Sequence, residues 1–161
     1  MNINLHTSQF MTHSVSWLDT KINTIMDGNF TKLCYIMPNM TMNGLYLVFP
    51  VELTKLECID DKIQIKFSSH TSINSEMIKN FTKIEGKMLD NYILTKQKPL
   101  KKVLLLSKQL FSGFMKVYKE NHYSTCNQPN IFCVKISGVW ETKDECGLTY
   151  KLFGGETIPE L

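Results

Sequence analysis

Lysine and aromatic side chains alternate in several short segments of this 161-residue sequence. In the clearest of them, Phe114, Lys116 and Tyr118 are spaced two residues apart and would share one face of a strand. An ammonium group neutralises a backbone phosphate, and an aromatic ring stacks on an unpaired base. The pattern is therefore typical of surfaces that bind single-stranded nucleic acid. Packing in a hydrophobic core is the alternative role for each aromatic residue taken singly.

The positive charge is concentrated in one stretch of the chain. The whole chain has a net charge of +3, and all 18 of its Lys and Arg residues are lysine. Residues 79–119 contain ten lysines and two acidic residues, a local net charge of +8. We interpret this stretch as a cationic track for a polyanion, and the solvated face of a helix followed by a loop is the alternative. Because arginine is absent, little discrimination between bases is expected.

The candidate binding residues follow from these two patterns. The lysines expected to neutralise phosphates are Lys79, Lys83, Lys87, Lys98, Lys101, Lys102, Lys116 and Lys119. The aromatic residues expected to stack on bases are Phe114, Tyr118 and Trp140. The expected partner is single-stranded DNA, and RNA is an open alternative. Whether the protein forms a homo-oligomer is also left open.

No motif of a common enzyme class is present in the sequence. It contains no phosphate-binding glycine loop, no G-x-S-x-G and no H-E-x-x-H. The spacing of His122, Cys126, Cys133 and Cys146 matches no common zinc module. We therefore predict a non-enzymatic protein without a metal or other cofactor.

Composition also limits the cellular setting that we expect. The five cysteines include no C-x-x-C pair, and the first residues do not resemble a secretion signal, so reduced thiols and an intracellular location are expected. No apolar run reaches the roughly 18 residues that a transmembrane helix needs, so no membrane association is expected.

Hydrophobic periodicity predicts several strands and two helices. Strands are expected over residues 32–37, 44–51, 63–67, 113–119, 131–142 and 147–153. A long helix is expected over residues 75–94, because its apolar residues recur every three or four positions beside a basic ridge of Lys79, Lys83 and Lys87. A short helix is expected over residues 14–27, where Val15, Leu18, Ile22 and Ile25 have helical spacing. Residues 103–106 cannot be classified from their pattern, and residues 121–130 are expected to form a loop.

The order of these elements predicts a mainly β protein of the α+β class. We expect a single domain over residues 1–161, made of an N-terminal helical extension (1–30), an OB-like core (31–153) and a flexible tail (154–161). The core would be a five- to six-stranded Greek-key barrel with one long helix, preceded by the short N-terminal helix. An antiparallel α+β sandwich with the helix on one face also fits this order.

The C-terminal segment carries a family resemblance. Residues 134–142 read VKISGVWET, and residues 146–152 read CGLTYKL. Together they resemble the closing hairpin of small single-stranded-DNA-binding proteins of OB type from large DNA viruses. The resemblance implies a coat for exposed strands during viral DNA replication or recombination, located in the host nucleus or cytoplasm. By this resemblance, Trp140 and Tyr150 would be hairpin residues near the packed or binding face.

Two further functions remain as alternatives to DNA binding. A viral protein-interaction or virulence module would use an adaptable surface, for which Met37, Met40 and Met42 are candidates. A virion structural protein would assemble in a concentration-dependent way instead of binding nucleic acid.

Overall fold

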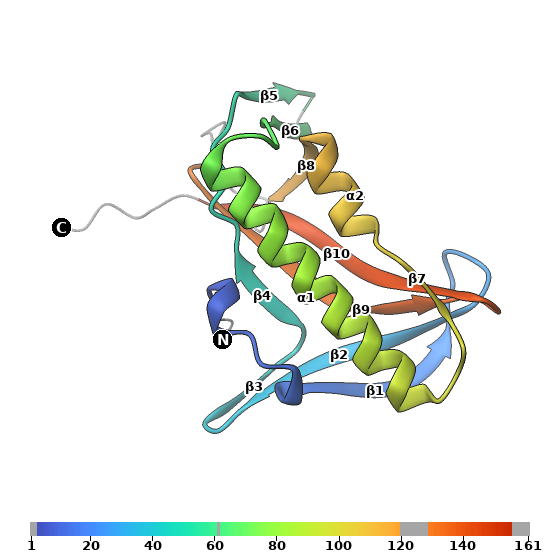
Figure 1. Ribbon diagram of the computed structural model, residues 1–161. Coiled ribbons are helices and arrows are strands. Elements are labelled where there is room, and N and C mark those ends of the chain that lie inside the picture. The colour runs from blue at the N-terminus through green and yellow to red at the C-terminus, as the bar shows by residue number, and fades with distance from the viewer. Residues whose placement is uncertain (1–2, 61, 120–128, 156–161) are drawn as a thin grey trace.

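A long antiparallel hairpin forms the centre of the fold in the computed structural model, which describes residues 3–60, 62–119 and 129–155 (Figure 1). The hairpin consists of β9 (Ile131–Glu141) and β10 (Glu145–Gly155). On its outer edge, β9 pairs with β2 (Asn29–Met37) and with β4 (Leu45–Val48), both antiparallel. On the other edge, β10 pairs in parallel with β7 (Lys101–Val103) and β8 (Phe114–Lys119).

Shorter strands extend the sheet on both sides of this centre. β1 (Val15–Ile22) and β3 (Met40–Met42) pair with β2. β6 (Lys62–Lys66) pairs with β8, and β5 (Lys55–Ile59) pairs with β6. The result is one mixed ten-stranded sheet. The prediction of a mainly β protein of the α+β class is confirmed.

The predicted OB-like Greek-key barrel of five to six strands is not confirmed. The main path of the sheet runs from β1 to β5, and the sheet is not closed. In addition, β10 forms two parallel pairings, with β7 and β8. Strand patterns in a sequence predict which segments are extended, whereas the pairing between distant segments depends on the whole fold.

The predicted N-terminal helix is wrong, because residues 15–22 form strand β1. The register of β1 against β2 shifts between Trp17 and Thr20, which marks a β-bulge. This extra residue breaks the two-residue alternation and gives the apolar residues their apparent helical spacing. Ile22 and Ile25, expected on a buried stripe, are 83% and 93% exposed. Before β1, residues 7–9 and 12–14 form two 3₁₀ turns, so the segment is no helical extension.

The predicted long helix is confirmed as α1 (Ser72–Lys96). The side-chain hydroxyl of Thr71 accepts a hydrogen bond from the backbone N–H of Asn74 and so caps the first turn of α1. The predicted apolar stripe is buried against the sheet: Met77, Phe81, Ile84, Met88 and Tyr92. The proposed adaptable methionine surface is not present as expected, because Met42 is buried and Met37 and Met40 pack against the same core.

A second helix, α2 (Leu105–Ser112), follows the segment that the sequence pattern left unclassified. Its first turn is capped by a fully buried residue of α1, Glu85. The Glu85 carboxylate accepts hydrogen bonds from the amides of Leu106 and Ser107 at 3.0 and 2.8 Å. Because a helix leaves its first amides without internal partners, this carboxylate fixes α2 onto α1. No helix in the described ranges is long and apolar enough to cross a membrane.

A buried carboxylate also joins α1 to the central hairpin. Glu141, at the end of β9, is 2% exposed. It accepts hydrogen bonds from the Tyr92 hydroxyl at 2.8 Å, from Lys98 Nζ at 2.7 Å and from Asn29 Nδ2 at 3.3 Å. Burial alone would raise the pKa of Glu141, but these three donors together hold it below its ordinary value. The ionised carboxylate is thus a tie between α1, β2, β9 and the segment after α1.

We predict that Glu141→Gln lowers the free energy of unfolding at pH 7 by about 1–3 kcal/mol, because a buried charged acceptor is lost. Since the pKa of Glu141 is lowered in the folded state, its contribution is complete above the ordinary carboxyl pKa of 4.5 and disappears as the pH falls through the folded value. Urea unfolding of wild type and variant at pH 7, 5, 4 and 3 measures this difference, which should shrink below pH 4.5.

Glu145→Gln is the matched control on the same hairpin. The Glu145 side chain is 44% exposed and lies 3.8 Å from Lys101 Nζ, so its loss should cost less than about 0.5 kcal/mol. The role of Glu141 as a buried acceptor would be contradicted if both variants lost the same free energy of unfolding. It would also be contradicted if the difference between wild type and Glu141→Gln stayed constant down to pH 3.

Candidate nucleic-acid interface

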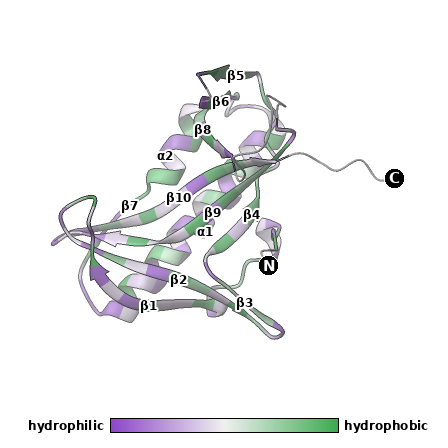
Figure 2. Cartoon of the chain, turned by 180° about the vertical axis from the view of Figure 1, so that it is seen from behind, coloured by the Kyte–Doolittle hydropathy of each residue, from purple (hydrophilic) through white to green (hydrophobic). Residues whose placement is uncertain are grey.

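The two faces of the sheet have different surroundings. In β2, Leu33 and Tyr35 are fully buried and belong to the core formed with α1, whereas Lys32 and Ile36 are exposed on the opposite face. Figure 2 is seen from this opposite side, with the helices behind the sheet. We call this surface the open face, because neither α1 nor α2 covers it. Most of its lysines are exposed, whereas Tyr46 and Cys133, which occupy open-face positions by strand register, are buried.

Tyr118 is the centre of a lysine and aromatic cluster on the open face. The ammonium groups of Lys116 and Lys151 both lie 4.8 Å from the centroid of its ring. The ring of Phe153, opposite Tyr118 in the β8–β10 pairing, lies 6.2 Å away. Phe114 extends the cluster along β8 and is 38% exposed. The cluster thus brings together cations and aromatic rings, the two kinds of group that single-strand binding uses.

Aromatic residues also lie over the central hairpin. Lys135 Nζ lies 5.3 Å from the centroid of the Tyr46 ring, and the two residues are opposite each other in the β4–β9 pairing. Phe30 is opposite Trp140 in the β2–β9 pairing. The Trp140 ring packs closely on Gly147, since a Cβ atom there would come within 2.5 Å of its Cζ2. Glycine at this position therefore lets the indole lie directly against the sheet.

Lysines outnumber acidic residues on the open face. By strand register its lysines are Lys21, Lys32, Lys55, Lys62, Lys66, Lys101, Lys116, Lys135 and Lys151. The acidic residues at paired strand positions of this face are Glu57 and Glu145, which form ion pairs with Lys55 and Lys101, and Asp19 lies in the bulge of β1 at its edge. A hydrogen bond from Lys55 is the main cause that lowers the pKa of Glu57. The surplus of ammonium groups makes this face attractive to a polyanion.

The predicted binding residues divide between two sides of the molecule. The open face carries Phe114, Lys116, Tyr118, Trp140 and Lys101. The basic ridge of Lys79, Lys83 and Lys87 is exposed on α1, on the helical side of the sheet. Lys119 ends β8 in the inward register of Met115 and Val117 and is half-buried.

The three other predicted lysines are engaged with carboxylates. Lys98 pairs with Glu141, Lys102 lies 2.6 Å from Asp90, and Lys101 lies 3.8 Å from Glu145. The sequence suggested that residues 79–119 form one track. In the structure, acidic partners from α1 and from the central hairpin neutralise part of that stretch.

Sequence reasoning missed several open-face residues because they come from strands far apart in the chain. They are Phe30, Lys32, Tyr46, Lys135, Lys151 and Phe153. The Tyr150–Lys151 neighbours were a usable signal, but only Lys151 is on the open face. Tyr150 points to α2, where its hydroxyl donates a hydrogen bond to Gln109, and burial raises its pKa to about 12.

The histidine and three cysteines whose spacing matched no common zinc module are only partly within the described residues. Cys133 and Cys146 lie near the starts of β9 and β10, at opposite ends of the hairpin. Burial raises the pKa of the Cys146 thiol to about 11. His122 and Cys126 lie outside the described residues. Among the residues that are described, no cluster of His, Cys, Asp or Glu could hold a metal ion.

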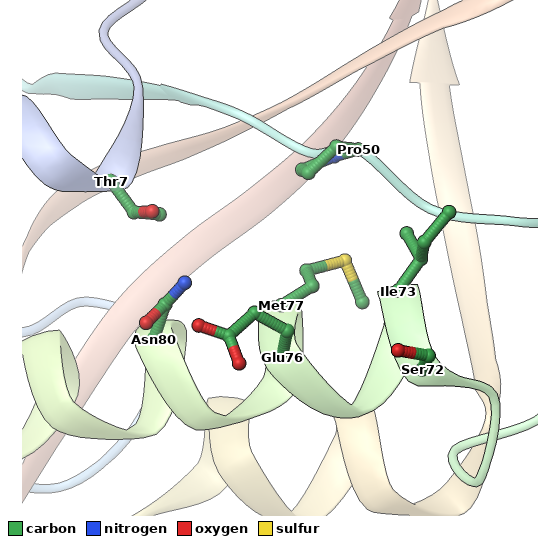
Figure 3. A pocket seen from close by; sticks show the side chains of 7 residues that line it. All are labelled: Thr7, Pro50, Ser72, Ile73, Glu76, Met77 and Asn80. Atoms are coloured by element: carbon green, nitrogen blue, oxygen red, sulfur yellow. The ribbon is translucent and has the colours of Figure 1, made fainter.

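A cavity on the helical side has a different chemical character (Figure 3). It has a volume of about 350 Å³ and lies at the beginning of α1, near Pro50 and Thr7. Its apolar walls are Ile73 and Met77, and its one charged lining group is the Glu76 carboxylate. A carboxylate repels a polyanion, so this cavity does not compete with the open face as a nucleic-acid site.

Comparisons of this chain with protein-family models, with curated proteins and with solved structures find no match. The assignment of a function therefore depends on the chemistry of the open face.

Proposed function

We propose that this protein binds single-stranded DNA across the open face of its sheet and acts without catalysis. The observation that carries the proposal is the cluster in which Lys116 and Lys151 flank the ring of Tyr118. The two ammonium groups would neutralise backbone phosphates, and the aromatic rings of the cluster would receive unpaired bases. Base stacking of this kind contributes about 1–3 kcal/mol per base and tolerates every base.

A single strand suits this face better than a duplex does. The bases of a duplex are stacked on one another, so their flat faces are not available to Tyr118, Phe114 or Trp140. The lysine side chains project from a broad sheet. The major groove of a duplex admits a helix or a two-stranded ribbon, and a broad sheet does not fit into it. Phosphate contacts alone would bind both forms, so the aromatic residues provide the preference for unpaired bases.

The proposed biological setting is the coating of exposed strands during viral DNA replication or recombination. It rests on the resemblance of residues 134–152 to the closing hairpin of viral single-strand binders. These residues form most of β9 and β10, which contribute Lys135, Trp140 and Lys151 to the open face. The resembling segment thus contributes part of the proposed binding surface.

We predict salt-sensitive binding of a labelled 30-nucleotide oligothymidine. If about four phosphates are neutralised, log K falls with log salt at a slope near −3, or about 50-fold in affinity between 50 and 200 mM salt. Fluorescence anisotropy titrations at the two salt concentrations measure this slope, and unlabelled duplex of the same length should compete poorly. Absence of binding at 50 mM salt, or an affinity that does not depend on salt, would refute the proposal.

We further predict that binding depends on the open face and not on α1. Lys116→Gln with Lys151→Gln should reduce the magnitude of the salt slope by about 1.4. Tyr118→Leu should weaken binding about 5- to 150-fold without changing the slope, because it removes stacking but no charge, whereas Tyr118→Phe should retain most of the affinity.

Lys83→Gln with Lys87→Gln is the matched control, since it removes the same charge from the exposed side of α1. This control should change affinity less than about twofold, and thermal unfolding should verify that every variant is folded. If the α1 pair costs as much affinity as the open-face pair, the interface has been placed on the wrong side of the molecule.

A further inference from the structure

A pocket opens where the β-bulge of β1 faces β2. Between Trp17 and Thr20, whose partners on β2 are Leu33 and Thr31, the two residues Leu18 and Asp19 lie opposite the single residue Lys32. The pocket has a volume of about 470 Å³, within the size range of roughly 300–1,000 Å³ that is usual for small-ligand sites. Its lining includes Phe30, so it is continuous with the open face. A strand lying across that face would pass this pocket.

The pocket combines an apolar lining with three charged groups. Trp17, Leu18 and Phe30 are its apolar residues, and Lys21, Lys32 and Asp19 are its charged residues. None of these three charged groups forms an ion pair with any residue in the described ranges. Asp19 differs in this respect from Glu57 and Glu145, which are each paired with a lysine. An unpaired carboxylate on a cationic face is unfavourable for phosphate, but it is a good acceptor for a base.

Guanine is the base whose hydrogen-bonding edge best matches a carboxylate. Its Watson–Crick edge presents two adjacent donors, N1–H and the N2 amino group, and a carboxylate has two acceptor oxygens. Adenine and cytosine each present one amino donor next to an acceptor nitrogen. Thymine presents one N–H between two carbonyl oxygens. A single carboxylate therefore favours an unpaired guanine through two parallel hydrogen bonds, while the other bases leave an acceptor facing it.

We propose that this pocket is a guanine-selective subsite of the single-strand interface. Phe30 supplies the apolar surface for the base, Asp19 accepts its two donors, and Lys21 and Lys32 neutralise the flanking phosphates. The inference rests on the proposed function and adds to it a preference that point-charge lysines cannot provide. The remaining open face would still bind any sequence.

Oligothymidines of 15 nucleotides with one central replacement test the subsite. Fluorescence anisotropy should give wild-type protein about 5- to 10-fold tighter binding when the central base is guanine than when it is thymine, adenine or cytosine. Hypoxanthine keeps the N1–H but lacks the N2 amino group, so an inosine replacement should lose most of this gain. Equal binding of all five oligomers by wild type would overturn the subsite and leave the proposed function standing. Binding of none of them would overturn both.

Asp19→Asn separates base recognition from general electrostatics. The variant should reduce the guanine-to-thymine affinity ratio to about 1, chiefly by losing guanine affinity relative to the other bases. Asp27→Asn is the matched control, because it removes the same charge from the exposed β1–β2 connection outside the pocket and should leave the ratio unchanged. If Asp19→Asn strengthens binding to all oligomers by the same factor, Asp19 acts only by repelling phosphate and the subsite is refuted.

Discussion

One long helix packs against one face of the sheet and thereby fixes which side chains of each strand are buried. Side chains alternate along a strand, so burying the odd positions of β2 under α1 necessarily turns its even positions to the other side. The same applies along β8 and β10. Because both helices lie on one side, the second face has no core to fill, and lysine and aromatic residues can occupy it without a loss of burial.

Two buried carboxylates make this one-sided arrangement rigid. Glu141 joins the end of β9 to α1, and Glu85 joins α1 to the first turn of α2. Each has its oxygens satisfied by several donors, so neither side chain leaves a buried polar atom without a partner. A binding surface made from separate strands needs this rigidity, because the distances between its cations depend on the sheet remaining in register.

The charge of the protein has a distribution that the linear sequence conceals. The segment 79–119 has the highest density of lysine, yet Lys98, Lys101 and Lys102 face carboxylates. Lys32, Lys135 and Lys151 come from segments of ordinary charge and gather on the open face through strand pairing. Coulomb attraction to a polyanion depends on which charges share a surface and remain unpaired, so density along the chain is a poor measure of it.

Local periodicity was enough to predict the mainly β character, the long helix with its apolar stripe, and the common face of Phe114, Lys116 and Tyr118. It could not determine the open sheet, the strand nature of β1 or the capping of α2 by Glu85. The open sheet depends on the register between distant strands. In β1, a bulge gives the apolar residues a spacing that is typical of a helix. The capping of α2 depends on contacts between residues far apart in the chain. The candidate site divides in the same way: Tyr118 and Lys116 are local, whereas Lys151, Lys135 and Phe30 join them only through pairing across the sheet.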